Sequence, residues 1–370
     1  MKFIQEFFEG CRVSGIYLCK HKQAAVTKNG KPYENVILQD KTGTIDAKIW
    51  DPNSLGIDDF ETLDYIEIMG DVTNFAGALQ LNIKRARKAR EGEYDPTDYL
   101  PVSKCDIDEM YGELMAIIKT IQNPYLSRLL ELFFVEDEAF IKRFRFNSAA
   151  KTVHHGFVGG LLEHTLNVTK LCDFYTKAYP ALNRDLLLTA AIFHDIGKTK
   201  IPEEILNAPR KLTPEEFEVM KRHPLYSFEL LGDDISEDVR YAVRWHHEKL
   251  DGKGYPDGLK AESISYFARI TTISDIYDAM LSARSYKKEK IPFDVMQWFV
   301  TEGSKGIDQN LLNIFIKNMV KVYRQQQVIM SDGREGCVEY IPLNDMDHPI
   351  VSVGEEVRQV DEDWYCVHMV

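Results

Sequence analysis

The histidines of this chain are concentrated in one stretch, and this distribution constrains the fold more than any other feature of the sequence. Seven of the ten histidines fall between residues 154 and 247. They are His154, His155, His164, His194, His223, His246 and His247. A metal ion in a protein needs about four or more ligands, so several imidazoles on successive helices indicate a site for more than one ion. The helices that carry these residues must therefore converge.

The segment Phe193-His-Asp-Ile-Gly-Lys198 lies at the centre of this pattern. The apolar run 187–193 contains neither glycine nor proline, which predicts a buried helix that brings His194 and Asp195 to the interior. Imidazole beside carboxylate suits borderline divalent cations, because it combines neutral nitrogen with anionic oxygen. Lys198 lies one helical turn beyond His194, where an ammonium could hold a phosphate oxygen.

Further candidate ligands lie in other segments with helical spacing. They are His164, His223, His246, His247 and Asp275. The helix that contains His223 is predicted to begin at Thr213 as N-cap, because Pro214 and two acidic residues follow it. The adjacent His154 and His155 either line the metal cleft or cap the start of a helix.

Residues 10–85 predict an all-β module. Five short runs have strand character, at 13–18, 35–39, 44–50, 65–69 and 79–83. Turn residues separate them at 29–30, 40–43, 70–71 and 76–77. This spacing is typical of a small Greek-key barrel of the OB type, which we expect within residues 1–92.

The barrel has two features that indicate single-strand binding. Tyr33, Trp50 and Phe75 could stack on bases, and the run 84–90 places five positive charges in seven residues. The basic candidates are Lys84, Arg85, Lys88 and Arg87. The alternative is that the aromatic rings fill the small core and the basic run is a solvated linker.

The rest of the chain predicts a multidomain α+β protein. A linker and packing helices are expected at 93–145, an all-α domain at 146–322, and a small β appendage at 323–370 with a hairpin turn at Asp332-Gly333. The packing helices are expected to join the all-α domain to the barrel.

Composition narrows the class of protein. Hydrophobic residues make up 44% and charged residues 28% of the chain, as in ordinary globular proteins. The net charge of −13 argues against non-specific coating of nucleic acid. No apolar run approaches the roughly 20 residues that cross a bilayer. Six dispersed cysteines without a Cys-x-x-Cys pair fit a reducing cytoplasm, so we expect a cytoplasmic protein without membrane contact.

Residues 160–310 resemble the HD phosphohydrolase superfamily, and specifically its HD-GYP branch. The matching segments share the motifs of that branch and are His194–Lys198, Ile201–Leu206, Lys211–Phe217, His223-Pro224, His246–Pro256 and Asp275–Lys287. The resemblance implies an all-α HD domain with two metal ions, usually iron or manganese, that hydrolyses cyclic di-GMP. Gly160 stands where some members carry a glutamate for a third ion, so two are expected.

The resemblance also implies the role of each site residue. The metal ligands would be His164, His194, Asp195, His223, His246, His247 and Asp275, with Asp195 bridging the ions. Lys198 and Arg284 would hold the phosphate. The substrate pocket would be shaped by Asp251, Gly252, Gly254, Tyr255 and Pro256. Two adjacent cations lower the pKa of a bridging water and stabilise charge on phosphorus.

The N-terminal half, up to about residue 198, resembles a different family, the YhaM-type 3′–5′ exoribonucleases, which join an OB-fold to an HD domain. Three functions follow. The first is a phosphodiesterase acting on cyclic di-GMP, with the barrel as a regulatory module. The second is a 3′–5′ exonuclease to which the barrel delivers single-stranded RNA or DNA. The third is a catalytically silent binding protein. Homo-oligomerisation stays open.

Overall fold

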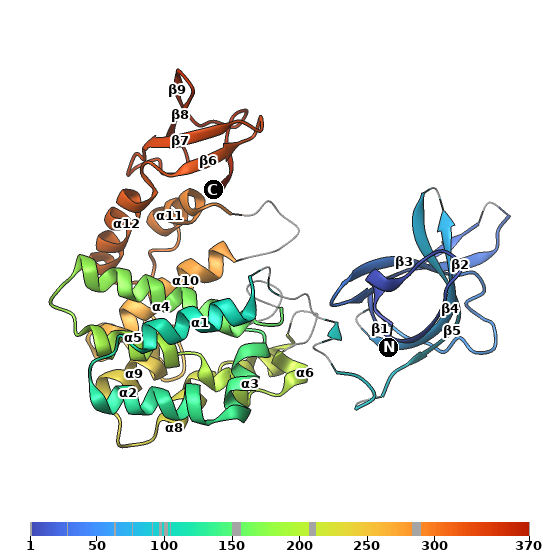
Figure 1. The fold of residues 1–370 in the computed structure, drawn as a ribbon, viewed down its shortest axis with the longest axis horizontal. Coiled ribbons are helices and arrows are strands. Elements are labelled where there is room, and N and C mark those ends of the chain that lie inside the picture. Colours follow the sequence, from blue (N-terminus) through green and yellow to red (C-terminus); the bar gives the residue numbers. More distant parts are fainter. Residues whose placement is uncertain are drawn as a thin grey trace. The chain divides into compact units, whose positions relative to one another are not determined.

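The protein is described by a computed structural model that covers residues 2–27, 29–62, 64–75, 77–90, 92–95, 98–99, 103, 105–149, 157–206, 212–282 and 290–369. The chain divides into two compact units (Figure 1). Most of residues 1–104 form the first, and most of residues 105–370 form the second.

The first unit is a closed five-stranded barrel. Its strands are β1 (Arg12–Val26), β2 (Pro32–Asp40), β3 (Gly43–Ile49), β4 (Tyr65–Phe75) and β5 (Ala78–Lys88), after a short turn of 3-10 helix, η1 (Ile4–Glu6). The strand order is β1-β2-β3-β5-β4, with β4 returning to β1. All pairs are antiparallel except β3 and β5. Alternate apolar side chains fill the interior, among them Val36, Leu38, Ile68 and Leu81. The barrel predicted from the sequence is confirmed.

One local prediction for the barrel was wrong. The turn predicted at Gly70-Asp71 does not form, because β4 continues through both residues and its register shifts between Met69 and Gly70. A Cβ atom on Gly70 would lie 2.4 Å from the backbone oxygen of Asn82, so glycine allows this bulge to form. In addition, β5 extends to Lys88, so most of the basic run belongs to a strand and not to a linker.

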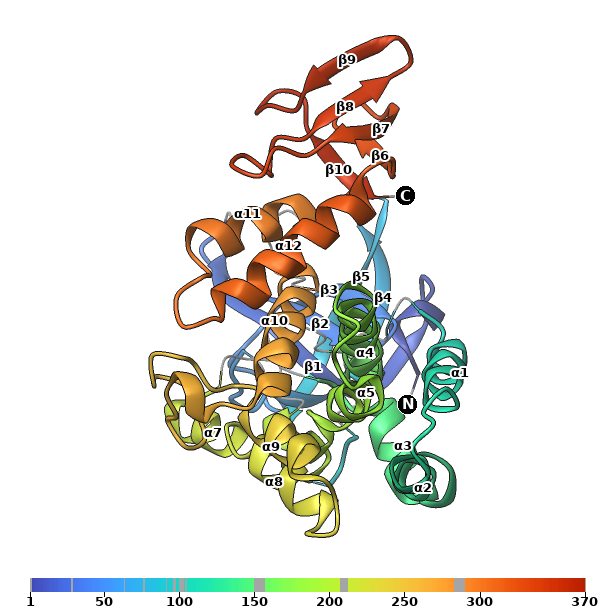
Figure 2. The same cartoon turned by 90° about the vertical axis from the view of Figure 1, so that its left-hand side faces the viewer.

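The second unit is largely helical. Its elements are α1 (Ile107–Ile118), α2 (Pro124–Glu131), the π-helical turn η3 (Leu132–Glu136), α3 (Glu138–Phe146), α4 (Gly160–Ala178), α5 (Arg184–Phe193), η4 (Ile196–Lys200), α6 (Glu203–Leu206), α7 (Pro214–Met220), α8 (His223–Leu231), α9 (Glu237–Trp245), η5 (Ala261–Ser263), α10 (Tyr266–Leu281), α11 (Pro292–Thr301) and α12 (Gln309–Tyr323). Helix α4 packs against α5 and α10, and α9 packs against α5, α8 and α10 (Figure 2). These helices carry the candidate site.

Helices α1 to α3 pack into the core of the helical unit. Leu114, Leu130 and Phe144 are fully buried in the same hydrophobic cluster as the residues of α4 and α5. Side chains of Asp106, Asn123 and Asp137 cap the three helices by accepting backbone N–H groups. The segment predicted as packing helices is thus part of the helical unit.

The helix predicted to run from Thr213 past His223 is two helices. Its start is confirmed, since the Thr213 hydroxyl accepts the Glu216 N–H and the Glu216 carboxylate accepts the Thr213 N–H. Helix α7 nevertheless ends at Met220, and α8 begins at His223 with Pro224 in its first turn. Pro224 has no N–H to donate to the Met220 carbonyl four residues earlier, so the hydrogen-bond ladder of one continuous helix is interrupted there.

The C-terminal segment forms a small antiparallel sheet. Its strands are β6 (Gln327–Met330), β7 (Glu335–Tyr340), β8 (Ile350–Val353), β9 (Glu356–Gln359) and β10 (Cys366–Met369), in the order β10-β6-β7-β8-β9. The predicted hairpin turn is confirmed, with Gly333 at positive φ. Val328, Val338 and Val351 join the hydrophobic core of the helical unit.

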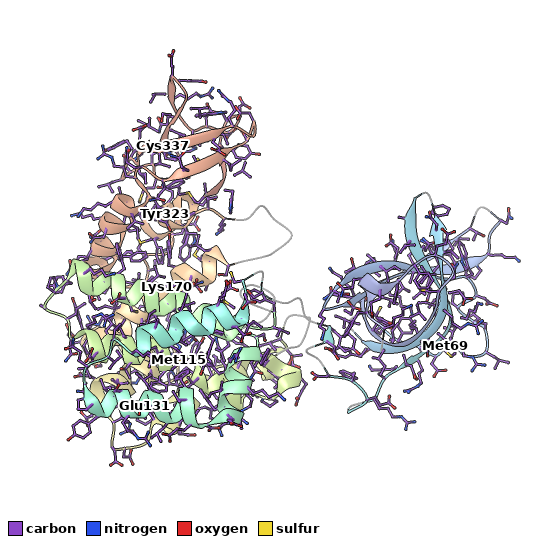
Figure 3. The ribbon with its side chains drawn as sticks, in the orientation of Figure 1. Met69, Met115, Glu131, Lys170, Tyr323 and Cys337 are labelled. Carbon is purple, nitrogen blue, oxygen red and sulfur yellow. The ribbon has the colours of Figure 1, made fainter. Side chains whose placement is uncertain are left out.

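Side chains fill the interior of both units (Figure 3). Near the junction of α12 with the sheet, the Tyr323 hydroxyl lies 2.9 Å from the hydroxyl of Tyr277 on α10. Within the described parts of the chain, none of the helices combines the length and the apolar character needed to cross a membrane.

Candidate metal centre

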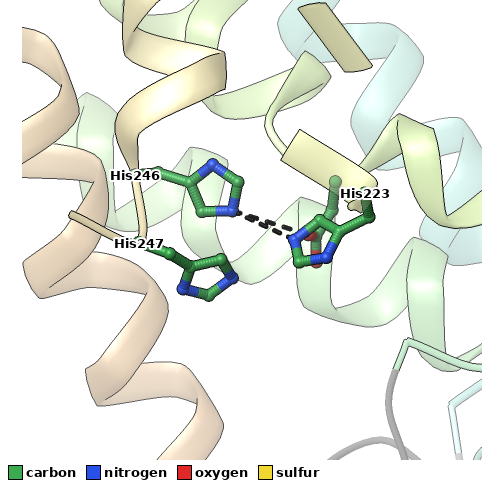
Figure 4. A group of neighbouring side chains, drawn as sticks. His223, His246 and His247 are labelled. Carbon is green, nitrogen blue, oxygen red and sulfur yellow. Dashed lines mark hydrogen bonds and ion pairs between the residues drawn. The ribbon is translucent and has the colours of Figure 1, made fainter. Parts of the chain in front are cut away.

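Five helices bring the predicted ligands to one place. Helix α5 ends at Phe193, so His194 and Asp195 follow directly from its buried C-terminal end. His164 comes from α4 and Asp275 from α10. His223 begins α8, and His246 and His247 follow the last residue of α9, so that these three imidazoles face one another (Figure 4). All seven predicted ligands meet here, although residues 164 and 275 are far apart in the sequence.

The carboxylate of Asp195 lies at the centre of this group and is 1% exposed. Its Oδ2 atom lies 3.3 Å from Nε2 of His164 and 3.4 Å from Nε2 of His194. Its Oδ1 atom lies 3.1 Å from Nε2 of His223 and 3.7 Å from Nε2 of His246. Each oxygen therefore faces its own pair of imidazoles, as expected of a carboxylate shared by two ions.

Backbone carbonyl groups set the tautomers of three of these histidines. Nδ1 of His194 lies 2.7 Å from the Ala191 oxygen. The corresponding distances are 2.8 Å from His223 to the Met220 oxygen and 2.7 Å from His246 to the Val243 oxygen. A carbonyl oxygen can only accept, so Nδ1 carries the proton in each ring. The Nε2 lone pairs are then directed towards Asp195.

This arrangement leaves a local excess of electron pairs. Nε2 of His223 lies 3.4 Å from Nε2 of His246 (Figure 4), and both rings carry their proton on Nδ1. Within the described part of the chain, Asp195 Oδ1 is buried and has no hydrogen-bond donor. Lone pairs that face one another around an unpaired carboxylate oxygen repel, and a cation between them removes the repulsion. The residues present therefore fit a metal ion.

The protonation states of three histidines also fit a metal. Burial lowers the pKa of His194 and His246, and lowers that of His247 to about 3. Burial opposes protonation of His164 too, but hydrogen bonds with the nearby carboxylates outweigh it and raise the pKa of His164, so a bound cation would have to displace that proton. Burial opposes ionisation of Asp195, but the Lys198 ammonium and the nearby histidines outweigh it and hold its pKa well below the usual value. Burial also opposes ionisation of Asp275, but a hydrogen bond with His164 and the charges of nearby histidines lower its pKa. Neutral imidazoles with carboxylates are the donors that divalent transition metals take.

Two overlapping groups of donors could each hold an ion. The first is His164, His194 and Asp195, and the second is Asp195, His223, His246 and His247. Within each group the ligand atoms lie within 4.8 Å of one another. Asp275 reaches both groups, since Oδ1 lies 3.1 Å from His164 Nε2 and Oδ2 lies 3.7 Å from His247 Nδ1.

Asp278 is a site residue that the sequence analysis missed. Its Oδ2 atom lies 2.7 Å from Nδ1 of His164, and the residue is buried. It follows Asp275 by three positions and therefore lies on the same face of α10. The three-residue spacing from Asp275 is therefore the sequence signal from which Asp278 could have been predicted. The carboxylate orients the His164 ring and directs Nε2 towards Asp195 and Asp275.

Lys198 occupies a different position from the one predicted. Because α5 ends at Phe193 and η4 follows, Lys198 is not on a continuous helical face with His194. Its Nζ atom instead lies 2.6 Å from Asp195 Oδ2. Lys198 thus contacts the Asp195 carboxylate directly. Arg284, His154 and His155 lie outside the described residues.

The predicted substrate loop lies beside the second donor group. The Tyr255 ring stacks on the His247 ring, with centroids 4.7 Å apart. Gly252 has φ +77°, and a Cβ atom on Gly254 would lie 2.4 Å from Glu248 Cα, so this path requires both glycines. Pro256 follows Tyr255 through a cis peptide bond, whereas Asp251 accepts the Lys253 N–H.

Glu248 is a second residue that the sequence analysis did not assign. Its buried carboxylate accepts the backbone N–H groups of Asp257, Gly258 and Leu259 at 2.6, 2.9 and 3.0 Å. These hydrogen bonds join the two ends of the loop that contains Tyr255.

The three aromatic candidates on the barrel do not fill its core. Trp50 is 52% and Phe75 68% exposed, and Tyr33 is half-buried. The Tyr33 and Trp50 rings stack with centroids 5.3 Å apart, and the Trp50 indole N–H donates to the Asn82 side chain at 2.9 Å. The structure thus brings Tyr33 and Trp50 together as one aromatic surface.

The basic run on β5 is largely neutralised. Lys84 pairs with Asp71 and Lys88 with Asp64. Arg87 pairs with Glu67 at 2.6 Å and with Glu93 at 2.8 Å. The Arg85 side chain lies against Gly56. Glu67 and Asp71 lie on β4, and Asp64 directly precedes that strand. The predicted basic groove therefore has far less net charge than its sequence indicates.

Comparison with known proteins finds a family model that matches most of the helical segment. Residues 137–311 match the family model described as an HD domain. The chain is 33% identical over 198 residues to a 3′–5′ exoribonuclease YhaM of a Geobacillus strain, a match that covers 53% of this chain. The chain spans 60% of the length of that relative.

Solved structures with similar parts have low overall similarity. An HDGYP protein of Bdellovibrio bacteriovorus, Bd1817, is 13% identical with a TM-score of 0.39, covering 67% of this chain and 93% of its own. The second OB-fold domain of replication protein A from Methanococcus maripaludis is 18% identical with a TM-score of 0.21, covering 25% of this chain and 96% of its own.

Proposed function

We propose that this protein is a metal-dependent phosphodiesterase that cleaves nucleotide phosphodiester bonds. The match of residues 137–311 to the HD-domain family model supports this proposal. The observation that carries the proposal is the Asp195 carboxylate, with one buried oxygen facing His164 and His194 and the other facing His223 and His246. Two divalent ions at such a centre would supply Lewis-acid activation of a water and of the phosphate. Iron or manganese would suit these donors.

The residues of the chain would prepare this chemistry before substrate arrives. Backbone carbonyls and Asp278 hold the imidazoles in one tautomer, so little reorganisation is needed when the ligands act. The low pKa of Asp195 and Asp275 keeps both carboxylates charged at neutral pH. Lys198 supplies a cation next to Asp195 that would balance phosphate charge.

Single-stranded RNA is the substrate that we favour. The similarity to an exoribonuclease at 33% identity supports it, as does the stacked Tyr33 and Trp50 surface on the barrel. Aromatic rings exposed on an OB-type barrel can stack on bases of any sequence. The barrel would then hold the strand while the HD domain cleaves it from the 3′ end.

Cyclic di-GMP is the second candidate. It is favoured by the segment from His246 to Pro256, whose Tyr255 ring lies against His247 beside the donor groups. An aromatic ring in that position could contact the base of a small cyclic substrate. The catalytically silent alternative is less favoured, because all seven candidate ligands converge.

The test is metal analysis of the purified protein together with hydrolysis assays. We expect about two transition-metal ions per chain, and metal-dependent release of mononucleotides from a short RNA. Activity should be lost on chelation and return on adding manganese. Hydrolysis of cyclic di-GMP alone would favour the second candidate, whereas bound metal without hydrolysis of either substrate would favour a binding protein.

Removal of residues 1–95 would distinguish the two substrates if the remaining chain stays folded by circular dichroism. An RNA exonuclease should lose most of its activity on long strands, because the barrel no longer holds them. A cyclic dinucleotide hydrolase should keep its turnover.

A further inference from the structure

A cavity of about 610 Å³ adjoins the metal centre within the helical unit. Its lining includes His246 and His247 of the second donor group, and also Tyr255. Its volume lies in the roughly 300–1,000 Å³ range of small-molecule sites. A molecule in this cavity would touch residues next to the proposed reaction centre.

Lysines outnumber carboxylates in the lining of the cavity. Four lysines line it, namely Lys221, Lys249, Lys253 and Lys305. Lys221 pairs with Glu218 and Lys253 with Asp251, but Lys249 and Lys305 have no ion-pair partner among the residues that the structure describes. Two carboxylates also line the cavity, Glu248 and Glu302, and the backbone N–H groups of 257–259 donate to Glu248. The ammonium groups of Lys249 and Lys305 are thus the cations available to hold an anion, while the Glu302 carboxylate offsets part of their charge.

The two unpaired lysines are held on segments that are fastened together. The Leu250 N–H donates to the Gly306 oxygen at 2.9 Å, which ties the segment of Lys249 to that of Lys305. Gly306 has φ +80°, and an added Cβ atom would lie 3.1 Å from Cβ of Lys249. The backbone of both lysines is therefore positioned before any ligand binds.

The lining also contains the aromatic side chain of Trp298, whose position is fixed by a neighbouring glycine. The Trp298 indole lies against Gly303, where an added Cβ atom would lie 2.2 Å from a ring carbon. Its backbone oxygen also accepts the Gly303 N–H at 2.8 Å. Because glycine leaves room for the ring, Trp298 stays beside the lysine-bearing turn 303–307. A flat ring next to ammonium groups matches a base joined to a phosphate.

We infer that this cavity binds the nucleotide next to the scissile phosphate, with Lys249 and Lys305 holding its phosphate and Trp298 contacting its base. The inference rests on the proposed function, because it assumes that the scissile phosphate lies at the metal centre. It assigns a substrate subsite to residues outside the predicted ligand set and outside the segment 251–256.

The test compares two double variants of the full-length, metal-loaded protein. Lys249→Ala with Lys305→Ala removes the two unpaired cations of the cavity. Lys142→Ala with Lys317→Ala removes two exposed lysines on α3 and α12 that do not line the cavity, so the change in net charge is the same. The substrates are a six-nucleotide RNA and bis(p-nitrophenyl) phosphate, a diester without a neighbouring nucleotide. Calorimetric titration with GMP measures binding without turnover.

We expect the cavity variant to raise KM for the RNA by at least about tenfold and to weaken GMP binding by a similar factor, since a single hydrogen bond to a charged group contributes about tenfold or more. Hydrolysis of bis(p-nitrophenyl) phosphate and metal content should stay within about twofold of wild type, and the control variant should match wild type throughout. This pattern would support the subsite.

Other results would overturn it. Unchanged KM and GMP affinity in the cavity variant, or an equal loss on both diesters, would remove the basis for a nucleotide subsite. A wild-type protein that hydrolyses neither substrate would contradict the proposed function, and GMP binding would still decide whether the cavity holds a nucleotide. If the double variant melts early, Lys305→Gln alone supplies the same comparison with less disturbance.

Discussion

The candidate metal centre and the outer surface of the barrel differ in how their charged and polar side chains are paired. At the centre, the Nε2 atoms of His223 and His246 face one another and Asp195 Oδ1 is left without a donor among the described residues. On the barrel, Lys84, Arg87 and Lys88 are paired with carboxylates of the same face. Both clusters stand out in the sequence.

The difference shows how a cluster of chemically active residues should be interpreted. Buried nitrogen and oxygen atoms that the fold leaves without a partner destabilise the protein. A bound ligand removes this cost, so such atoms indicate a site. Charges that the fold matches on an exposed strand contribute little to binding or to stability. The predictions below test this distinction, from the largest expected effect to the smallest.

Substitution of Asp195, which we propose to be shared by two ions, should have the largest effect. We expect Asp195→Asn to lower activity by more than about 100-fold, because even residues that only orient metal ligands contribute 10–100-fold. Metal content should fall in parallel, as measured by mass spectrometry of the purified protein. Retention of both ions and of most activity would contradict a shared ligand.

Loss of the residue that orients His164 should have a smaller effect. Asp278→Ala is expected to reduce metal affinity about 10–100-fold, because the ring loses the acceptor that fixes its tautomer. Competition with a chelator measures this change. Asp278→Asn keeps an acceptor oxygen and should lose less, so equal losses in the two variants would argue against an orienting role.

On the barrel, the aromatic surface and not the basic strand should carry nucleic-acid binding. Trp50→Ala is expected to weaken binding of a single-stranded RNA by about 1–3 kcal/mol, the contribution of one stacked base. Fluorescence anisotropy measures the affinity. Phe8→Ala removes another exposed aromatic side chain of the same unit and serves as the control. Equal effects of the two changes would remove the special role of Trp50.

The smallest effect is expected from the paired basic residues. Lys84→Ala with Lys88→Ala should change RNA affinity by less than about threefold and leave its salt dependence nearly unchanged. If both lysines contacted phosphates, the slope of log K against log salt would fall by about 0.7 for each. Titrations at several salt concentrations separate these cases, and a full loss of slope would show that the ion pairs open when RNA binds.

The sequence predicted much of this molecule because many of its signals are local. The apolar run before His194 specifies a buried helix, and the cap at Thr213 specifies a helix start. Alternating strands with turn residues predicted the barrel. Failures occurred where a distant segment decides the outcome, as at Gly70, whose bulge depends on contact with Asn82. Asp278 was missed because its spacing from Asp275 shows only that both lie on one helix face, and its role depends on contact with the distant His164.

The sequence by itself determined which donor types are present and which elements carry them, since residue chemistry and periodicity act over a few neighbouring positions. Only the tertiary structure decided that each oxygen of Asp195 faces a different pair of histidines and that Lys198 contacts this carboxylate. It also decided that acidic partners neutralise the basic strand. These outcomes depend on packing between segments far apart in the chain, where distances of a few Å set electrostatic interactions that no local pattern records.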